Sequence, residues 1–314
     1  MGEDALKDPG LYSIKFVSNG GYVSKAINGK VWDLAIARKD CVALIDIPFT
    51  MKTEALLDGG SKISSGFIKD NVLSSYSNVD GKYAALFAPW GIYSPTCIQG
   101  YHRIDNNGYA TDTDGSYTYY PSRVELPGSF GYLMALASAL KSGANNWVAM
   151  AGATRGQIPF LIGLKEEFTE SDIEKYQTRK SISINPIATI NPFGMIVWGN
   201  RTMYDNALKG NLIASSFLNI RNLCSDVKKT VWTTSRRLTF EQNSDILWVN
   251  FKSYITPILD QMVTGGCLSG YELKKRANKQ KAELRAVVRL YPIEAVEDFD
   301  IELQLADEST AIIE

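Results

Sequence analysis

The side chain best suited to acid–base chemistry is the single histidine, His102, whose ordinary pKa lies near neutral pH. A Ser-His-Asp or Cys-His catalytic arrangement would have to use it. It lies in GYHRIDNNGY, a turn-rich stretch with no serine elbow nearby, which favours a surface-loop histidine. One histidine also excludes a histidine-rich metal site.

Two aspartates in TDTDGSY, Asp112 and Asp114, resemble half of a calcium loop. Counted from Asp112, the glycine comes two residues earlier than an EF-hand requires. A hairpin turn at Asp114-Gly115 is therefore the favoured interpretation. An ion site that joins these two aspartates to Asp105 stays open as the weaker alternative.

Paired carboxylates also occur, as Glu166 with Glu167 and as Glu294 with Glu297. No spacing rule puts either pair across a substrate, as a glycosidase would need. GATRG (152–156) has neither the Walker lysine nor the G-x-G-x-x-G spacing of a phosphate loop. The sequence thus predicts no enzyme, no cofactor and no metal site.

The net charge and the spacing of the cysteines exclude further classes of protein. The 314 residues carry a net charge of −1, so the basic surplus of a nucleic-acid binder is absent. Four scattered cysteines without a CxxC pair suit a reducing cytoplasm. No apolar run has the 18 or so residues of a membrane span, and the polar start is unlike a secretory signal.

The elements that would position such side chains follow an α/β pattern. Residues 11–50 predict strand, helix and buried strand, with the helix over 23–40, and such a βαβ unit implies a partly parallel sheet. Further strands are predicted at 82–95 and 146–152, and a helix at 128–143. A turn-rich surface excursion is predicted over 99–120.

The last third is predicted to be a smaller assembly region. Amphipathic helices are expected over 217–236 and 244–263, and a strand over 282–293. Residues 297–305 alternate strictly, which indicates a half-buried strand with an acidic outer face. Its inward set is Phe299, Ile301, Leu303 and Leu305, and its outward set is Asp298, Asp300, Glu302 and Gln304.

The fold class expected is therefore α/β or α+β, a mixed, partly parallel sheet flanked by helices and followed by a smaller helix-and-strand region. We expect a core domain over residues 1–200 and a second domain over 201–314. The basic run KKRANKQK (274–281) favours a solvated connector. Its sharper alternative is a salt-bridge partner, through Lys274, Lys275 and Arg276, for the acidic strand of a neighbouring subunit.

Several strings, taken in order, resemble the core of contractile-tail sheath proteins from phage tails and related injection machines. The resemblance spans roughly residues 11–307. Its members are KFVSNGGY and LAIARKDCVALIDIP (15–48), DGKYAALFAPWGIY (80–93), PSRVELPGSFGYLMALASAL (121–140), NNWVAMAGATRGQIP (145–159), VWGNRTM (197–203), LNIRNLCSDVKKTVW (218–232), FEQNSDILW (240–248), GGCLSGYEL (265–273) and AVVRLYPIEAVEDFDIELQL (286–305).

The resemblance implies a structural subunit that polymerises as stacked hexameric rings around a tail tube and contracts to drive the tube through a host envelope. It implies as partners other copies of the chain, the tail tube protein, and baseplate and tail terminator proteins, with no nucleic acid and no membrane insertion. The location implied is the virion, after assembly in the host cytoplasm. Sheath proteins usually start with an N-terminal arm, so the chain is expected to be a C-terminal core fragment.

Three alternatives stay open. A tailocin or type VI-like secretion system also has a sheath, and these residues do not separate such sheaths from those of phages. A phage hydrolase would need a cleft with convergent carboxylates. An adhesin would suit the aromatic excursion at 99–120, but the fibre repeats expected of one are absent.

Overall fold

The structure, a computed structural model, describes residues 3–58, 62–94, 109–111, 117–119, 124–277 and 283–293. Its centre is a five-stranded sheet in the order β1-β2-β5-β11-β12. The first four strands are parallel and the last is antiparallel to its neighbour, so the predicted mixed, partly parallel sheet is confirmed. The strands are β1 (Phe16–Ser18), β2 (Val42–Asp46), β5 (Ala84–Ala88), β11 (Asn185–Ile190) and β12 (Gly194–Val197).

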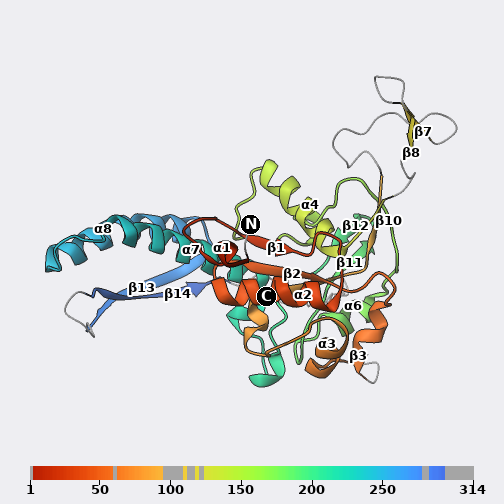
Figure 1. Cartoon of the computed structure of the whole chain (residues 1–314), viewed down its shortest axis with the longest axis horizontal. Helices are drawn as coiled ribbons and strands as arrows, with labels where there is room; N and C mark the ends of the chain where they lie inside the picture. Colours follow the sequence, from red (N-terminus) through yellow and green to blue (C-terminus); the bar gives the residue numbers. More distant parts are fainter. Residues whose placement is uncertain are drawn as a thin grey trace, which may run out of the picture.

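Helices cover both faces of this sheet, which makes three layers. α2 (Lys25–Arg38), α3 (Ser65–Asn71) and α6 (Glu170–Tyr176) lie on one face, and α4 (Gly128–Lys141) lies on the other (Figure 1). Every residue of β2 and β5 is buried, as expected for strands covered on both sides. Alternate side chains of these two strands enter two separate hydrophobic cores, one on each face.

The two strongest helix predictions in this part are confirmed. α2 begins after Ser24, whose hydroxyl accepts from the amide of Ile27, and it ends at Lys39 in the left-handed conformation. α4 ends before Gly143, which has a φ of +89°.

Two strand predictions need correction. The strand expected over residues 11–22 is only three residues long, because the chain before Phe16 is held by side chains instead of by a sheet. The strand expected over 146–152 is not formed. The backbone carbonyl of Trp147 instead accepts from the amide side chain of Asn219, and the short helix α5 (Gly152–Arg155) follows.

Smaller elements surround the sheet. β6 (Gly91–Tyr93), β9 (Val124–Leu126) and β10 (Leu161–Leu164) form a three-stranded antiparallel sheet. Most of the predicted excursion lies outside the described residues. Within it, β7 (Tyr109–Thr111) pairs antiparallel with β8 (Tyr117–Tyr119) on either side of Asp114-Gly115. The remaining short elements are α1 (Glu3–Lys7), β3 (Leu57–Asp58), β4 (Lys62–Ile63), and the 3-10 turns η1 (Thr53–Leu56), η2 (Asp80–Tyr83), η4 (Asn206–Leu208) and η5 (Ala214–Ser216).

The C-terminal elements form an elongated arm that projects from the sheet, at the left of Figure 1. It consists of α7 (Leu218–Arg237), α8 (Asp245–Thr264), β13 (Leu268–Arg276) and β14 (Arg285–Pro292). The arm has its own core, whose buried residues run from Leu223 to Leu268, whereas those of the other two cores run from Val31 to Leu218. The domain division at residue 200 stays a prediction.

Candidate assembly surface

The arm carries a two-stranded sheet of long strands. β13 and β14 pair antiparallel from Leu268 opposite Pro292 to Arg276 opposite Arg285. Within the described ranges, no third strand pairs with either of them. Strands of nine and eight residues therefore each have one edge to which no other described strand is bonded. Such an edge is a template for another strand.

One face of this hairpin is apolar and packs on the helices. Tyr271, Leu273, Val288 and Leu290 lie against the arm core. The core is supplied by side chains that recur about every four residues along α8, which is the spacing of one helical face. Its α8 members are Leu247, Phe251, Ile255, Leu259 and Met262.

The opposite face of the hairpin is mainly basic. Alternation along the strands puts Lys274 and Arg276 of β13, with Arg285 and Arg289 of β14, on that outer face. Glu272 lies among them and pairs with Lys274 and, at 2.8 Å, with Arg289. Lys274 and then Arg289 lower the pKa of this carboxyl.

The three predicted basic residues lie on two different faces of the hairpin. They lie in a strand, not in the solvated connector that the sequence favoured, and the strand sends Lys275 to the inner face. Its ammonium lies 2.9 Å from the carboxylate of Asp245 at the start of α8. The hydrogen bond from Lys275 lowers the pKa of Asp245. Lys275 thus joins the hairpin to α8, while Lys274 and Arg276 remain exposed.

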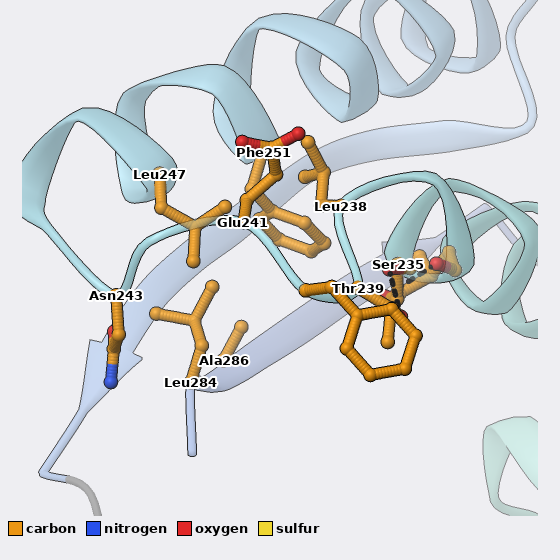
Figure 2. A pocket seen from close by; sticks show the side chains of 11 residues that line it. Ser235, Leu238, Thr239, Glu241, Asn243, Leu247, Phe251, Leu284 and Ala286 are labelled. Atoms are coloured by element: carbon orange, nitrogen blue, oxygen red, sulfur yellow. Dashed lines mark hydrogen bonds between the residues drawn. The ribbon is translucent and has the colours of Figure 1, made fainter. Parts of the chain in front are cut away.

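A cavity of about 420 Å³ opens where the helices meet the free end of the hairpin (Figure 2). Leu238, Leu247 and Phe251 supply an apolar floor, and Leu284 and Ala286 of the β14 side form one wall. Two polar side chains at the rim have partners within the chain. The hydroxyl of Thr239 donates to the carbonyl of Ser235 at 3.2 Å, and the side chain of Asn243 donates to the carbonyl of Glu283 at 3.2 Å. The apolar floor and the size of the cavity are suited to binding an apolar side chain.

Asparagines join the arm to the sheet domain. The side chain of Asn200 donates to that of Asn219 at 2.7 Å and accepts from its backbone amide at 3.2 Å. The carbonyl of Asn200 also accepts from the amide of Leu218 at 2.9 Å. Two of the amides that a helix start leaves unpaired are therefore bonded from the preceding loop. Sequence reasoning noted both strings, VWGNRTM and LNIRNLCSDVKKTVW, but had no signal for this pairing.

Of the carboxylate candidates, Glu166 accepts from the backbone amide of Thr53 and Glu167 accepts from the hydroxyl of Thr189. The other predicted site residues lie outside the described ranges. These are Phe299, Ile301, Leu303 and Leu305, together with His102, Asp105, Asp112, Asp114, Glu294 and Glu297. In the part of the chain that the structure describes, no three histidine, cysteine or acidic side chains gather as a metal site. No helix among the described residues is long and apolar enough to cross a membrane.

No family model matches the chain. Among curated proteins, it is similar to the tail sheath protein of Vibrio phage KVP40, with 23% identity over 279 residues. The match covers 83% of this chain and 37% of the phage protein, so the chain spans about a third of the length of this relative.

Solved structures show the same fold. The sheath complex of an extracellular contractile injection system, PVC, in its contracted state superposes with a TM-score of 0.66 at 18% identity, covering 98% of this chain and 75% of that one. The anti-feeding prophage baseplate superposes with a TM-score of 0.59 at 14% identity, covering 90% and 66%. The resemblance to contractile-tail sheath proteins is therefore confirmed, in sequence by the phage protein and in fold by the injection-system sheath.

Proposed function

We propose that this chain is a structural subunit of a contractile phage tail sheath, and that it assembles by sharing strands between copies. The observation that carries the proposal is the β13–β14 hairpin, which has an apolar face, a basic face and two open edges. Strand addition to an open edge uses main-chain hydrogen bonds, so it connects subunits without requiring a particular side chain at every position.

The segment 297–305 is suited to be the added strand. Its apolar residues, such as Ile301 and Leu303, would continue the inner face of the hairpin and extend the arm core. On the β14 side, the same set would meet the cavity bounded by Leu284 and Ala286. A strand of period two fits only in this orientation, because a slip of one residue would bury its carboxylates.

Charge supports the same pairing. Residues 294–314 contain eight acidic and no basic side chains. The outward acidic set of 297–304 would lie beside the outer face that carries Lys274, Arg276, Arg285 and Arg289. Opposite charges on neighbouring strands stabilise a sheet by roughly 0.2–1 kcal/mol per pair. Complementary charges therefore select the register more than they supply affinity.

Copies linked in this way would form stacked hexameric rings around a tail tube. Because the link is made by extended chain, sheath domains would slide past one another without losing connection. Contraction would then release the energy of new contacts between subunits, as in other subunit rotations. Baseplate and terminator proteins would close the ends, and the assembly would reside in the virion after forming in host cytoplasm.

The test is self-association of the chain, measured by sedimentation velocity and followed by negative-stain electron microscopy. A monomer has a mass of 34.7 kDa. We expect concentration-dependent oligomers and hollow or ring-shaped particles. A chain that stays at the monomer mass at every concentration and salt would count against strand sharing.

A charge-reversal experiment tests which residues form the proposed contact between subunits. The double variant Lys274→Glu with Arg276→Glu should weaken association, and adding Asp300→Lys with Glu302→Lys should restore it. Lys275→Glu is the matched control, because Lys275 bonds to Asp245 within the chain. It should lower the stability of the arm without being rescued by the same reversal. Failure of the four-residue variant to recover would refute the register.

The relatives are sheath proteins, which suggests a role without catalysis. The sheath of a tailocin or type VI-like system remains the alternative, since the structural neighbours are injection systems. Hydrolase and adhesin functions gain no support from the described residues.

A further inference from the structure

The chain before the first strand forms an N-terminal strap, residues 6–15. The strap begins with the last two residues of α1, turns where the amide of Leu11 donates to the carbonyl of Asp8, and runs beside α2 and α7 before Phe16 enters the sheet. Few of its side chains are buried. Leu11 is 64% exposed, and only Ile14 packs against a hydrophobic core, as a partly buried residue. Something other than apolar burial therefore holds the strap.

The main holding group is the guanidinium of Arg38, at the end of α2. One terminal nitrogen donates to the carbonyls of Leu6, at 2.7 Å, and Asp8, at 3.2 Å. The other donates to the carbonyl of Tyr12, at 2.8 Å. The remaining donors bind both carboxylate oxygens of Asp40, at 2.9 and 3.0 Å. All five N–H groups of a fully buried arginine side chain are used, and three of them bind the strap.

α7 holds the other end of the strap. The ammonium of Lys229 donates to the carbonyl of Ile14, and Lys15 pairs with Asp226 at 3.0 Å. The neighbouring Lys228 has a different partner, since it donates to the carbonyl of Arg38 at 2.9 Å. Lys229 therefore binds the strap, whereas Lys228 binds α2.

A surface pocket of about 260 Å³ opens between the strap and α7. It is lined by Pro9, Ser13, Asp40, Lys228, Lys229, Trp232 and Thr233. Beside this pocket the strap touches α7, since a Cβ at Gly10 would lie 3.1 Å from Arg236 and 3.3 Å from Trp232. The strap therefore covers part of one aromatic side chain, and its other attachments are mainly polar.

We propose that the strap is a releasable element, latched by Arg38 and Lys229, which opens while the sheet and both of its cores stay folded. Opening exposes the carbonyls, the guanidinium and the ammonium to water, so each group regains hydrogen bonds. A comparable stretch of β2 could not open in this way, because all five of its residues are buried. A released segment of ten residues would reach at most about 35 Å from Phe16.

Native-state proteolysis tests the inference. Trypsin should cleave after Lys7 when the strap is open, and mass spectrometry follows release of the N-terminal peptide. Cleavage after Lys15 also requires β1 to open, so it reports loss of the sheet edge. When opening and closing are fast, the cleavage rate tracks the open population. We expect release under native conditions, with a urea dependence far below that of global unfolding.

Adjacent lysines supply a matched pair of variants. Lys229→Met should speed release by about tenfold, because it removes a charge-assisted hydrogen bond to the strap. Lys228→Met should change it by less than about twofold. Arg38→Lys keeps the charge beside Asp40 but lacks the planar five-donor group, so it should act more strongly, by about a hundredfold.

Two results would overturn the proposal. One is release that occurs only with the urea dependence of global unfolding, since the strap would then open only with the whole protein. The other is an equal acceleration by Lys228→Met and Lys229→Met. Both readouts use the unassembled chain, so they are independent of whether it forms a sheath.

Discussion

Replacing Asn219 by alanine should weaken the joint between the arm and the sheet domain. Asn219 is 6% exposed, and its side chain makes two hydrogen bonds, accepting from Asn200 and donating to the carbonyl of Trp147 at 3.1 Å. Alanine would leave both of these partner groups buried without a partner. Each such group costs about 1–3 kcal/mol. The better helix propensity of alanine returns only about 0.7 kcal/mol.

We therefore expect the free energy of unfolding to fall by about 3 kcal/mol. Urea denaturation measures this loss, and hydrogen exchange of α7 and α8 locates it. Exchange should rise in both helices while β2 and β5 stay protected. Asn250→Ala, at an exposed position of α8, is the control and should raise stability by no more than about 0.7 kcal/mol, through helix propensity alone. A loss of less than about 0.5 kcal/mol for Asn219→Ala would refute the idea that this pair holds the joint.

Three further predictions concern the cores. Burial raises the pKa of Asp46 to about 6, although Ser129 and Asn19 donate to it. The folded pKa of Asp46 thus exceeds its unfolded value, so this carboxyl contributes stability below about pH 4 that is lost as the pH rises through 6. The loss amounts to up to about 3 kcal/mol. Asp46→Asn should therefore remove this pH dependence from the free energy of unfolding measured by urea denaturation. Gly81→Ala should prevent soluble expression or cost several kcal/mol in urea denaturation, because its Cβ would lie 2.2 Å from the backbone carbonyl oxygen of Met203. Leu259→Ala, at 1% exposure in the arm core, should cost about 2–5 kcal/mol in the same assay.

The sequence predicts elements well where a single periodicity governs them. α4, α7 and α8 begin and end within two residues of their expected limits, because caps and apolar spacing act locally. The sequence did not predict β13, because its local signal is weak. Only three of its nine residues are apolar, and its basic end LKKR predicts a solvated loop until β14 is placed beside it. Pairing between distant strands is not a local property.

The candidate assembly surface could also be predicted only in part from the sequence. Once β13 is known to be a strand, alternation predicts that Lys274 and Arg276 point outward. The hydrogen bond from Lys275 to Asp245 joins residues 30 positions apart, so it could be found only from the folded structure. The strap shows the same limit more strongly. Nothing in the sequence marks Arg38 as different from other arginines at helix ends, since its three carbonyl partners come from a segment about 30 residues away.

The polar contacts of this molecule have two different mechanical consequences. At the arm, the pair formed by Asn200 and Asn219 is buried and reciprocal, so breaking it leaves groups that water does not reach. At the strap, the Arg38 side chain is also buried, but its carbonyl partners belong to a surface segment, so release of that segment would expose both sides of these hydrogen bonds to water. The proposed opening of the strap would therefore cost less free energy than separation of Asn200 from Asn219. Hydrogen exchange of the two regions would measure this difference directly.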